Sequence, residues 1–336
     1  MNTPLLRRLP AALTVAALTL AALSACAPTA SAPDGGASTS DAADAPITIE
    51  NCGSEVTLAA PAKRIVLVNN DSLPNLEALD AVDRVVALTS TVQPGLYKDS
   101  TYTTLDSLDL LSTEKNATGG SIVSQESILG ARPDLVIAPE NAVDRAALAA
   151  AGIAVYTPSA YCANPGPELS QPATFDRVWS EVRTLGALLG ESDQAEQVVA
   201  QGAASLGSEA PDAGTAAALY VSSGGSVLSP YGGPSMVTPV FAAAGLTNVY
   251  ADSPERVFDA NIEDIISRDP ATIVLLYSSG EPKDVIDSFM SAPGVSALSA
   301  VQKGRVVALQ FPYTDPPSML SIAGPQQVRG LLSTLP

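Results

Sequence analysis

Hydrophobic residues along the chain fall into short apolar runs that alternate with segments of helical spacing. Strands that alternate with helices in this way are typical of βαβ units and a mostly parallel sheet. The pattern therefore predicts an α/β fold with two Rossmann-like lobes and a ligand cleft between them. The expected strands are Ile65–Val68, Val85–Leu88, Leu135–Ala138 and Ile153–Tyr156 in the first lobe and Ala217–Val221, Ile273–Leu276 and Val306–Leu309 in the second.

The stretch from Thr174 to about Leu206 has a different pattern. It contains no proline and places Phe175, Val178 and Val182 at helical spacing. We predict one long or slightly broken helix that connects the lobes. The expected domains are then residues 47–172 for the first lobe, 173–208 for the connecting helix and 209–336 for the second lobe.

The N-terminus has the features of an export signal. Arg7 and Arg8 precede an apolar run, which ends in Leu23-Ser24-Ala25-Cys26, the spacing of a bacterial lipobox. We expect residues 1–25 to be a lipoprotein signal peptide and Cys26 to carry lipid such as palmitate, on the extracellular face of the cytoplasmic membrane. An ordinary signal peptide with a chance cysteine is the alternative. Residues 26–46 are small and polar, which favours a disordered stalk.

Two cysteines remain if Cys26 carries lipid. Cys52 and Cys162 form an even pair in an exported chain, which favours a disulfide over two unpaired thiols. Cys52 lies within an expected hairpin of Ile47–Ile49 and Glu55–Leu58. The bond would attach this hairpin to the end of the first lobe.

Composition excludes several kinds of catalytic site. The chain has no histidine, so it lacks Ser-His-Asp, Cys-His and imidazole-based metal sites, and no GxSxG, Walker or GxGxxG motif occurs. Its net charge of −18 argues against nucleic acid or anionic lipid surfaces as partners. We expect a monomeric binding protein with no cofactor or resident metal. A lipid-anchored hydrolase, including a carboxylate-pair glycosidase, and a sensory or adhesion module remain alternatives.

Candidate ligand contacts follow the expected strands. In open α/β sheets, ligands bind beyond the carboxyl ends of strands. Glycines in Tyr231-Gly232-Gly233-Pro234, within the expected loop from Ser222 to Pro234, would let the backbone approach a ligand. Each tyrosine could instead be a packing residue. The candidates are Asn69, Asn70, Asp71, Glu140, Asn141, Tyr161, Tyr231, Arg256, Tyr277 and Tyr313.

The two halves of the sequence share a local motif. Glu126 starts a short helical pattern that ends at Pro133 before a strand, and Glu263 does the same before Pro270. Either glutamate alone could simply favour its helix terminus through the macrodipole. Their matched placement favours a paired function.

In these features the chain resembles the helical-backbone class of substrate-binding proteins of ABC importers, the family that handles ferric siderophores, haem and cobalamin. The resemblance spans roughly Ile47 to Leu332. It implies that Glu126 and Glu263 dock on arginines of a membrane permease, and that the lobes close only slightly. The segments that carry it are Cys26, Lys63-Arg64-Ile65-Val66, Glu126 with Pro133-Asp134-Leu135-Val136, Phe175-Asp176-Arg177-Val178, Ala243-Ala244-Gly245 with Asn248-Val249, Glu263 with Pro270, and Pro316-Pro317-Ser318.

The resemblance narrows the ligand to a compact organic molecule or chelate. Among strand-end loops only Arg256 is a plausible cationic contact, which disfavours anionic catecholates and favours a hydroxamate iron-siderophore. Absence of histidine disfavours haem, and Val257 and Phe258 stand where cobalamin binders have a tryptophan. Cobalamin or another organic cofactor remains the alternative ligand.

Overall fold

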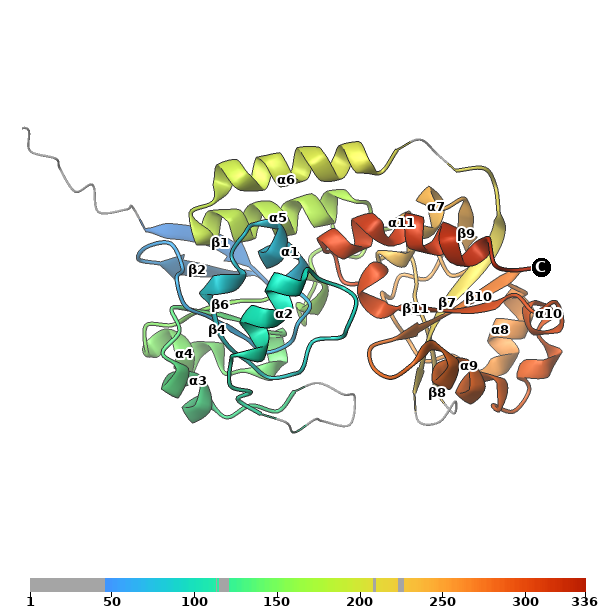
Figure 1. The fold of residues 1–336 in the computed structure, drawn as a ribbon, viewed down its shortest axis with the longest axis horizontal. Helices are drawn as coiled ribbons and strands as arrows, with labels where there is room; N and C mark the ends of the chain where they lie inside the picture. The colour runs from blue at the N-terminus through green and yellow to red at the C-terminus, as the bar shows by residue number, and fades with distance from the viewer. Residues whose placement is uncertain (1–45, 113, 115–120, 208–209, 223–226) are drawn as a thin grey trace, which may run out of the picture. The chain divides into compact units, whose positions relative to one another are not determined.

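A computed structural model describes residues 46–112, 114, 121–207, 210–222 and 227–336 (Figure 1). The predicted signal peptide, Cys26 and the stalk up to residue 45 lie outside the described residues, as does Ser223-Gly224-Gly225. Among the helices described, none has both the length and the apolar character that a membrane span requires.

The first lobe is built on a four-stranded parallel sheet. Its strands lie in the order β4-β3-β5-β6. Successive side chains of β3 alternate between two core clusters, with Ile65 and Leu67 on one face and Val66 on the other, all fully buried. This alternation confirms the predicted α/β class. The elements are β3 (Ile65–Leu67), α1 (Leu73–Ala78), β4 (Val85–Leu88), α2 (Asp99–Asp106), α3 (Gln125–Ala131), β5 (Leu135–Ile137), α4 (Arg145–Ala150) and β6 (Ala154–Tyr156).

An antiparallel hairpin precedes this sheet. Strand β1 (Ile47–Asn51) pairs with β2 (Ser54–Leu58), and Cys52 stands in the turn between them. The structure joins Cys52 to Cys162, with their Cα atoms 5.3 Å apart. The Asn51 side chain adds two hydrogen bonds to the backbone of Thr157, each 2.8 Å long. The hairpin is therefore attached to the segment that follows β6.

The segment expected as one long or slightly broken connecting helix is two antiparallel helices. These are α5 (Asp176–Leu189) and α6 (Ser192–Ser205), which lie side by side. Gly190 ends α5 in a left-handed conformation, with φ 72°, and the chain reverses there. Small residues permit the close approach of the two helices. A Cβ on Gly186 would lie 2.5 Å from the Cβ of Ala195, and a Cβ on Gly202 would lie 2.8 Å from the Trp179 ring. The prediction allowed a slight break but missed the chain reversal, because helical spacing alone does not reveal one.

The second lobe has a five-stranded sheet in the order β11-β10-β7-β8, with β9 beside β7. All pairings are parallel except β7 with β8, which are antiparallel. Strand β8 lies within the stretch expected as a loop from Ser222 to Pro234, so that expectation was wrong. The elements are β7 (Gly214–Ser222), β8 (Val227–Pro230), α7 (Val237–Ala243), β9 (Leu246–Asn248), α8 (Ile262–Arg268), β10 (Thr272–Tyr277), α9 (Pro282–Met290), α10 (Ser299–Gln302), β11 (Val306–Gln310) and α11 (Met319–Leu332).

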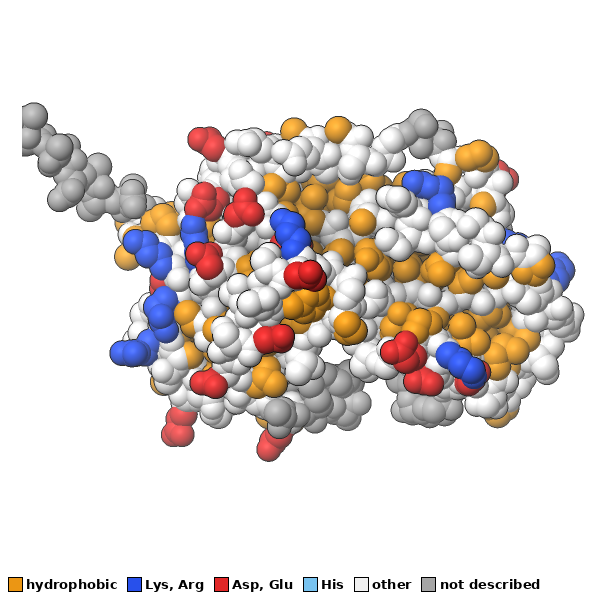
Figure 2. All heavy atoms as spheres, viewed as in Figure 1, with side chains coloured by type: hydrophobic (Ala, Val, Ile, Leu, Met, Phe, Trp, Pro, Cys, Tyr) orange, Lys and Arg blue, Asp and Glu red, His pale blue; other side chains and the backbone are white. Residues whose placement is uncertain are grey.

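The lobes share part of one hydrophobic core. Met236 and Ile322, from the second lobe, belong to the cluster that covers one face of the first sheet. The backbone N–H of Met319 donates to Asn75 Oδ1 over 2.9 Å, so α11 is also bonded to α1. On the face shown in Figure 2, acidic and basic side chains are scattered rather than gathered into one patch. The acidic side chains on this face are therefore best explained by solvation of the protein surface.

Candidate functional site

A pocket of about 450 Å³ lies where strand ends of the two lobes meet. One wall is the loop Thr91–Pro94 after β4, and the other is Tyr277–Pro282 after β10, with Gln310 at the end of β11. The Gln310 side chain donates to the Pro94 carbonyl over 3.1 Å and links the walls. The pocket thus lies at the carboxyl ends of parallel strands, where the sequence predicted the cleft. Of the predicted contacts, Tyr277 lines it.

A polar cluster joins other predicted residues from both lobes. Asp71 follows β3 and Tyr161 follows β6, and the Tyr161 hydroxyl donates to Asp71 Oδ2 over 2.5 Å. Asn69 Nδ2 donates to the same oxygen over 2.7 Å. Arg256, from the second lobe, lies over the Tyr161 ring with Cζ 5.4 Å from its centroid. The structure therefore brings four predicted residues together.

Arg256 also forms an ion pair with Asp315, a residue that the sequence reasoning missed. The side chain of Asp315 is 1% exposed, and its other oxygen accepts a 3.1 Å hydrogen bond from the Met236 backbone. Burial lowers the pKa of Arg256, but Asp315, Tyr161 and Tyr231 together raise it by more, so the net shift is upward. The positive charge of Arg256 is thus compensated inside the protein. The position of Asp315 after β11 was the signal available in the sequence.

Asp71 is the acid of this cluster whose protonation falls near neutral pH. Burial raises the pKa of Asp71 from 3.8 to about 6, although the hydrogen bond from Tyr161 lowers it. Asp315 and Arg256 act on it with opposite signs. Arg256 therefore does not serve as the counter-ion of Asp71, because its own partner cancels its field.

Hydrogen bonds and neighbouring tyrosines connect this cluster to the pocket. Asn70 Nδ2 donates to the carbonyl oxygens of Ser90 and Thr91, over 3.2 and 3.0 Å, and Thr91 is part of the pocket wall. Burial raises the pKa of Tyr97 most, and the charge of Asp71 raises it further. Tyr97 stands in the loop after β4, and no periodic pattern had singled it out. Its interactions with Asp71 and Tyr313 add it to the candidate site.

Tyr313 belongs to the same region. It follows β11 and is partly buried, and its phenol contributes to the raised pKa values of Tyr97 and Tyr277. Tyr231 is different, because it is 5% exposed and packs on Phe311 with ring centroids 6.1 Å apart. Tyr313 therefore keeps part of its surface accessible, whereas Tyr231 is a buried packing residue.

The glycine pair after Tyr231 packs against protein. A Cβ on Gly232 would lie 2.2 Å from the carbonyl oxygen of Glu255, and one on Gly233 2.5 Å from that of Ala251. Gly232 N–H also donates to the Arg256 carbonyl over 3.0 Å. The expectation that these glycines let a ligand approach the backbone was wrong, because the segment 251–256 packs against them instead.

Glu140 and Asn141 lie in a separate pocket. This pocket, of about 530 Å³, is lined from the first lobe by Val123, Ile128 and Leu148 among others. The Glu140 carboxylate accepts a hydrogen bond from the backbone of Ala163. The structure thus does not bring these two residues to the pocket between Thr91–Pro94 and Tyr277–Pro282.

Glu126 and Glu263 occupy matching places in the two lobes. Each is the second residue of a seven-residue helix, α3 or α8, and each is exposed. Ser124 and Asn261 cap these helices by accepting a backbone hydrogen bond from the third helical residue. Each helix ends in a residue with positive φ directly before proline.

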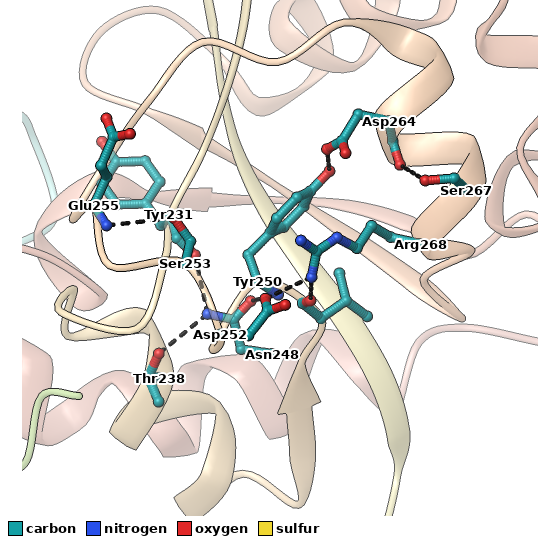
Figure 3. A network of polar contacts seen from close by, with 11 residues as sticks. Tyr231, Thr238, Asn248, Tyr250, Asp252, Ser253, Glu255, Asp264, Ser267 and Arg268 are labelled. Carbon is teal, nitrogen blue, oxygen red and sulfur yellow. Dashed lines mark hydrogen bonds and ion pairs between the residues drawn. The ribbon is translucent and has the colours of Figure 1, made fainter. Parts of the chain in front are cut away.

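A polar network holds α8 to the segment that carries Arg256 (Figure 3). The Tyr250 hydroxyl donates to Asp264 Oδ2 over 2.8 Å, and Arg268 lies over the Tyr250 ring, 4.8 Å from its centroid. Asn248 Nδ2 donates to the Tyr231 carbonyl over 2.9 Å. The helix that carries Glu263 is therefore fixed relative to the wall of the site.

Known proteins share this architecture. The sequence profile of the family described as periplasmic binding protein matches residues 65–313. A structure from Saccharomonospora viridis DSM 43017, described as an ABC-type Fe3+-hydroxamate transport system, is 34% identical, with TM-score 0.77, and the alignment covers 85% of this chain and 98% of that one.

More distant structures show the fold alone. A periplasmic vitamin B12 binding protein from Vibrio cholerae is 19% identical, with TM-score 0.55, over 82% of this chain and 98% of that one. A molybdate periplasmic binding protein from Haemophilus influenzae is 17% identical, with TM-score 0.62, over 85% and 91%. No curated protein matches the chain. The chain therefore belongs to the family of periplasmic binding proteins, the solute receptors of ABC transporters.

Proposed function

We propose that this protein is a lipid-anchored receptor of an ABC importer that captures a ferric hydroxamate chelate. Family membership implies an extracytoplasmic location and delivery of a small ligand to a permease. The 34% identical protein from S. viridis is described as part of an Fe3+-hydroxamate transport system, which supports this ligand class.

The observation that carries the proposal is the state of the two arginines beside the cleft. Arg256 is paired with buried Asp315. The Arg177 guanidinium donates to backbone carbonyls, including those of Pro234 and Gln171 at 2.6 Å each. Compensation of the Arg256 charge and occupation of the Arg177 donors therefore disfavour binding of an anionic catecholate chelate. A ferric tris-hydroxamate is neutral, because three monoanionic groups balance Fe3+, and it does not need such a cation.

The tyrosines of the site suit a neutral chelate. Tyr277 lines the pocket, and Tyr313 interacts electrostatically with both Tyr277 and Tyr97. Such side chains cover apolar linkers of a chelate while donating hydrogen bonds to its oxygens. Asp71, Tyr161 and Asn69 supply the polar end of the site.

Attachment and delivery complete the proposal. The Leu23-Ser24-Ala25-Cys26 spacing supports lipid attachment at Cys26, and Cys26→Ala should release the protein from membranes. Glu126 and Glu263, exposed on matching helices, would bind permease arginines through charge-assisted hydrogen bonds.

Titration of the purified protein with three ligands tests the ligand class. We expect a neutral ferric tris-hydroxamate to bind with Kd in the micromolar range or below, and a ferric tris-catecholate, which carries three negative charges, to bind far more weakly. Native mass spectrometry gives the stoichiometry. Tighter binding of the catecholate, or of cobalamin used as the third ligand, would contradict the proposal.

A further inference from the structure

Asp71 is the acid of the polar cluster that has no cationic partner. Among the described residues, no lysine or arginine lies within ion-pair distance of its carboxylate, whereas Asp315 is paired with Arg256. Asp71 receives hydrogen bonds from two neutral groups, the Asn69 amide and the Tyr161 hydroxyl. Its negative charge is therefore uncompensated within this part of the protein.

One oxygen of the Asp71 carboxylate is available to a ligand. Both hydrogen bonds end on Oδ2, and within the described chain Oδ1 accepts none. Asp71 keeps partial solvent exposure, so this oxygen is not sealed in the core. The adjacent residue carries a second acceptor, Asn70 Oδ1, which is buried and also has no donor among these residues. Two neighbouring acceptors without donors favour a ligand group that carries several N–H bonds.

The location of Asp71 fits contact with a bound chelate. Asp71 follows β3, the strand beside β4, and the adjacent Asn70 is bonded to Thr91 in the pocket wall. Parallel strands deliver their carboxyl ends to the same edge of the sheet. A group that extends from a chelate in the pocket would therefore meet Asp71.

We propose that Asp71 makes the site selective for ferric hydroxamates that bear a terminal ammonium group, which its carboxylate binds. This inference rests on the proposed function and adds the charge class of the ligand. The ammonium supplies the missing positive charge and donors to Asp71. Hydrogen bonds between charged partners are the stronger class of such bonds, so the group contributes to selectivity.

Two chelates that differ in one charge test the proposal. The first is a linear ferric tris-hydroxamate with a terminal primary amine, and the second is the same compound with that amine acetylated, which is neutral. Kd is measured for wild type, for Asp71→Asn and for Asp83→Asn. Asp83 is exposed on the turn before β4, so its variant removes the same charge elsewhere and is the matched control.

The wild type should bind the ammonium chelate at least about tenfold more tightly than the acetylated one. This ratio is the effect expected of one charge-assisted hydrogen bond. Asp71→Asn should abolish this preference by weakening the ammonium chelate far more than the acetylated one, whereas Asp83→Asn should retain it. Equal affinities in wild type, or an unchanged preference in Asp71→Asn, would overturn the inference while the proposed function stands. If neither chelate binds wild type, both fail.

A pH series supplies a second readout. The pKa of Asp71 is about 6, so the preference for the ammonium chelate should be full at pH 7.5 and should disappear by pH 4.5 as Asp71 becomes protonated. Tyr161, Tyr97, Arg256 and Asp315 face this carboxyl group. The acetylated chelate, which should show no comparable change, controls for them. A preference that persists undiminished at pH 4.5 would contradict the role of Asp71.

Discussion

The guanidinium group of Arg256 lies over the ring of Tyr161, with Cζ 5.4 Å from the ring centroid. Tyr161 follows β6 of the first lobe, and Arg256 belongs to the second, so this contact joins the lobes beside the cleft. Each side chain is also held within its own lobe. Tyr161 donates a hydrogen bond to Asp71 in the first lobe, and Arg256 forms an ion pair with Asp315 in the second. The side chains that we propose for ligand binding therefore also join the lobes.

Replacement of Gly232 by alanine should disturb this contact. The added Cβ would lie 2.2 Å from the Glu255 carbonyl oxygen, so the segment that carries Arg256 must move. We expect a loss of about 1–3 kcal/mol in the free energy of unfolding, as for other overpacked sites, and weaker chelate binding. Urea denaturation and chelate titration measure these effects.

Gly130→Ala is the control for that variant. Gly130 lies in α3 and an added Cβ would meet nothing within 4 Å, so alanine should stabilise by up to about 1 kcal/mol through helix propensity. Stability of Gly232→Ala equal to that of Gly130→Ala would show that the close contact with Glu255 is unimportant.

Asp71→Asn should raise stability at neutral pH. Burial raises the folded-state pKa of Asp71 from 3.8 to about 6, so the folded protein holds this proton more tightly than the unfolded chain. Ionised Asp71 therefore destabilises the fold above pH 6, and this cost vanishes below about pH 4. The variant should be about 1–3 kcal/mol more stable at pH 7.5 and equal to wild type near pH 4. Urea denaturation across this range checks the sign, and a variant that is less stable at pH 7.5 would refute it.

Loss of the Cys52–Cys162 bond should destabilise the first lobe. The bond closes a loop of sequence separation 110, and its removal in Cys52→Ser, Cys162→Ser should cost about 2–4 kcal/mol by releasing the unfolded chain. Thermal melting of this variant and of reduced wild type should agree. Because Asn51 still bonds to Thr157, we expect the hairpin to stay folded. An unchanged melting temperature in both samples would argue against a stabilising role.

Charge reversal at Glu126 and Glu263 should separate transport from binding. Both residues are exposed and lie outside the residues that line the cleft, so Glu126→Arg, Glu263→Arg should leave chelate affinity nearly unchanged. Uptake should fall strongly, because like charges would face the permease arginines. Each change should cost about 0.3–1 kcal/mol in stability through the helix dipole.

Glu50→Arg provides the control for each single reversal, Glu126→Arg or Glu263→Arg, with the same charge change on the exposed edge of β1. Uptake into vesicles that contain the permease measures the effect. Normal uptake by a well-folded double variant would remove the docking role, and an equal loss in Glu50→Arg would reduce it to an effect of net charge.

Local sequence was sufficient to predict most strands and the repeated motif of the two lobes. Short apolar runs such as Ile65–Val68 and the stops at Pro133 and Pro270 act within a few residues, so their outcome can be predicted without the rest of the fold. The reversal at Gly190 was not predictable in this way. It depends on Gly186 and Ala195 meeting at close range, which is a property of two packed helices.

The same distinction between local sequence and tertiary structure applies to the candidate site. The sequence by itself determined that polar residues such as Asp71, Tyr161 and Tyr277 follow strands, and parallel strands bring such ends to one edge. Only the tertiary structure decided that Asp315 compensates Arg256, that Gly232 meets Glu255 and that Glu140 lines another pocket. Most of these contacts join residues distant in sequence, and their charge and packing depend on partners that no local pattern encodes. The uncompensated charge of Asp71 follows from those partners, and so does the ligand that we infer.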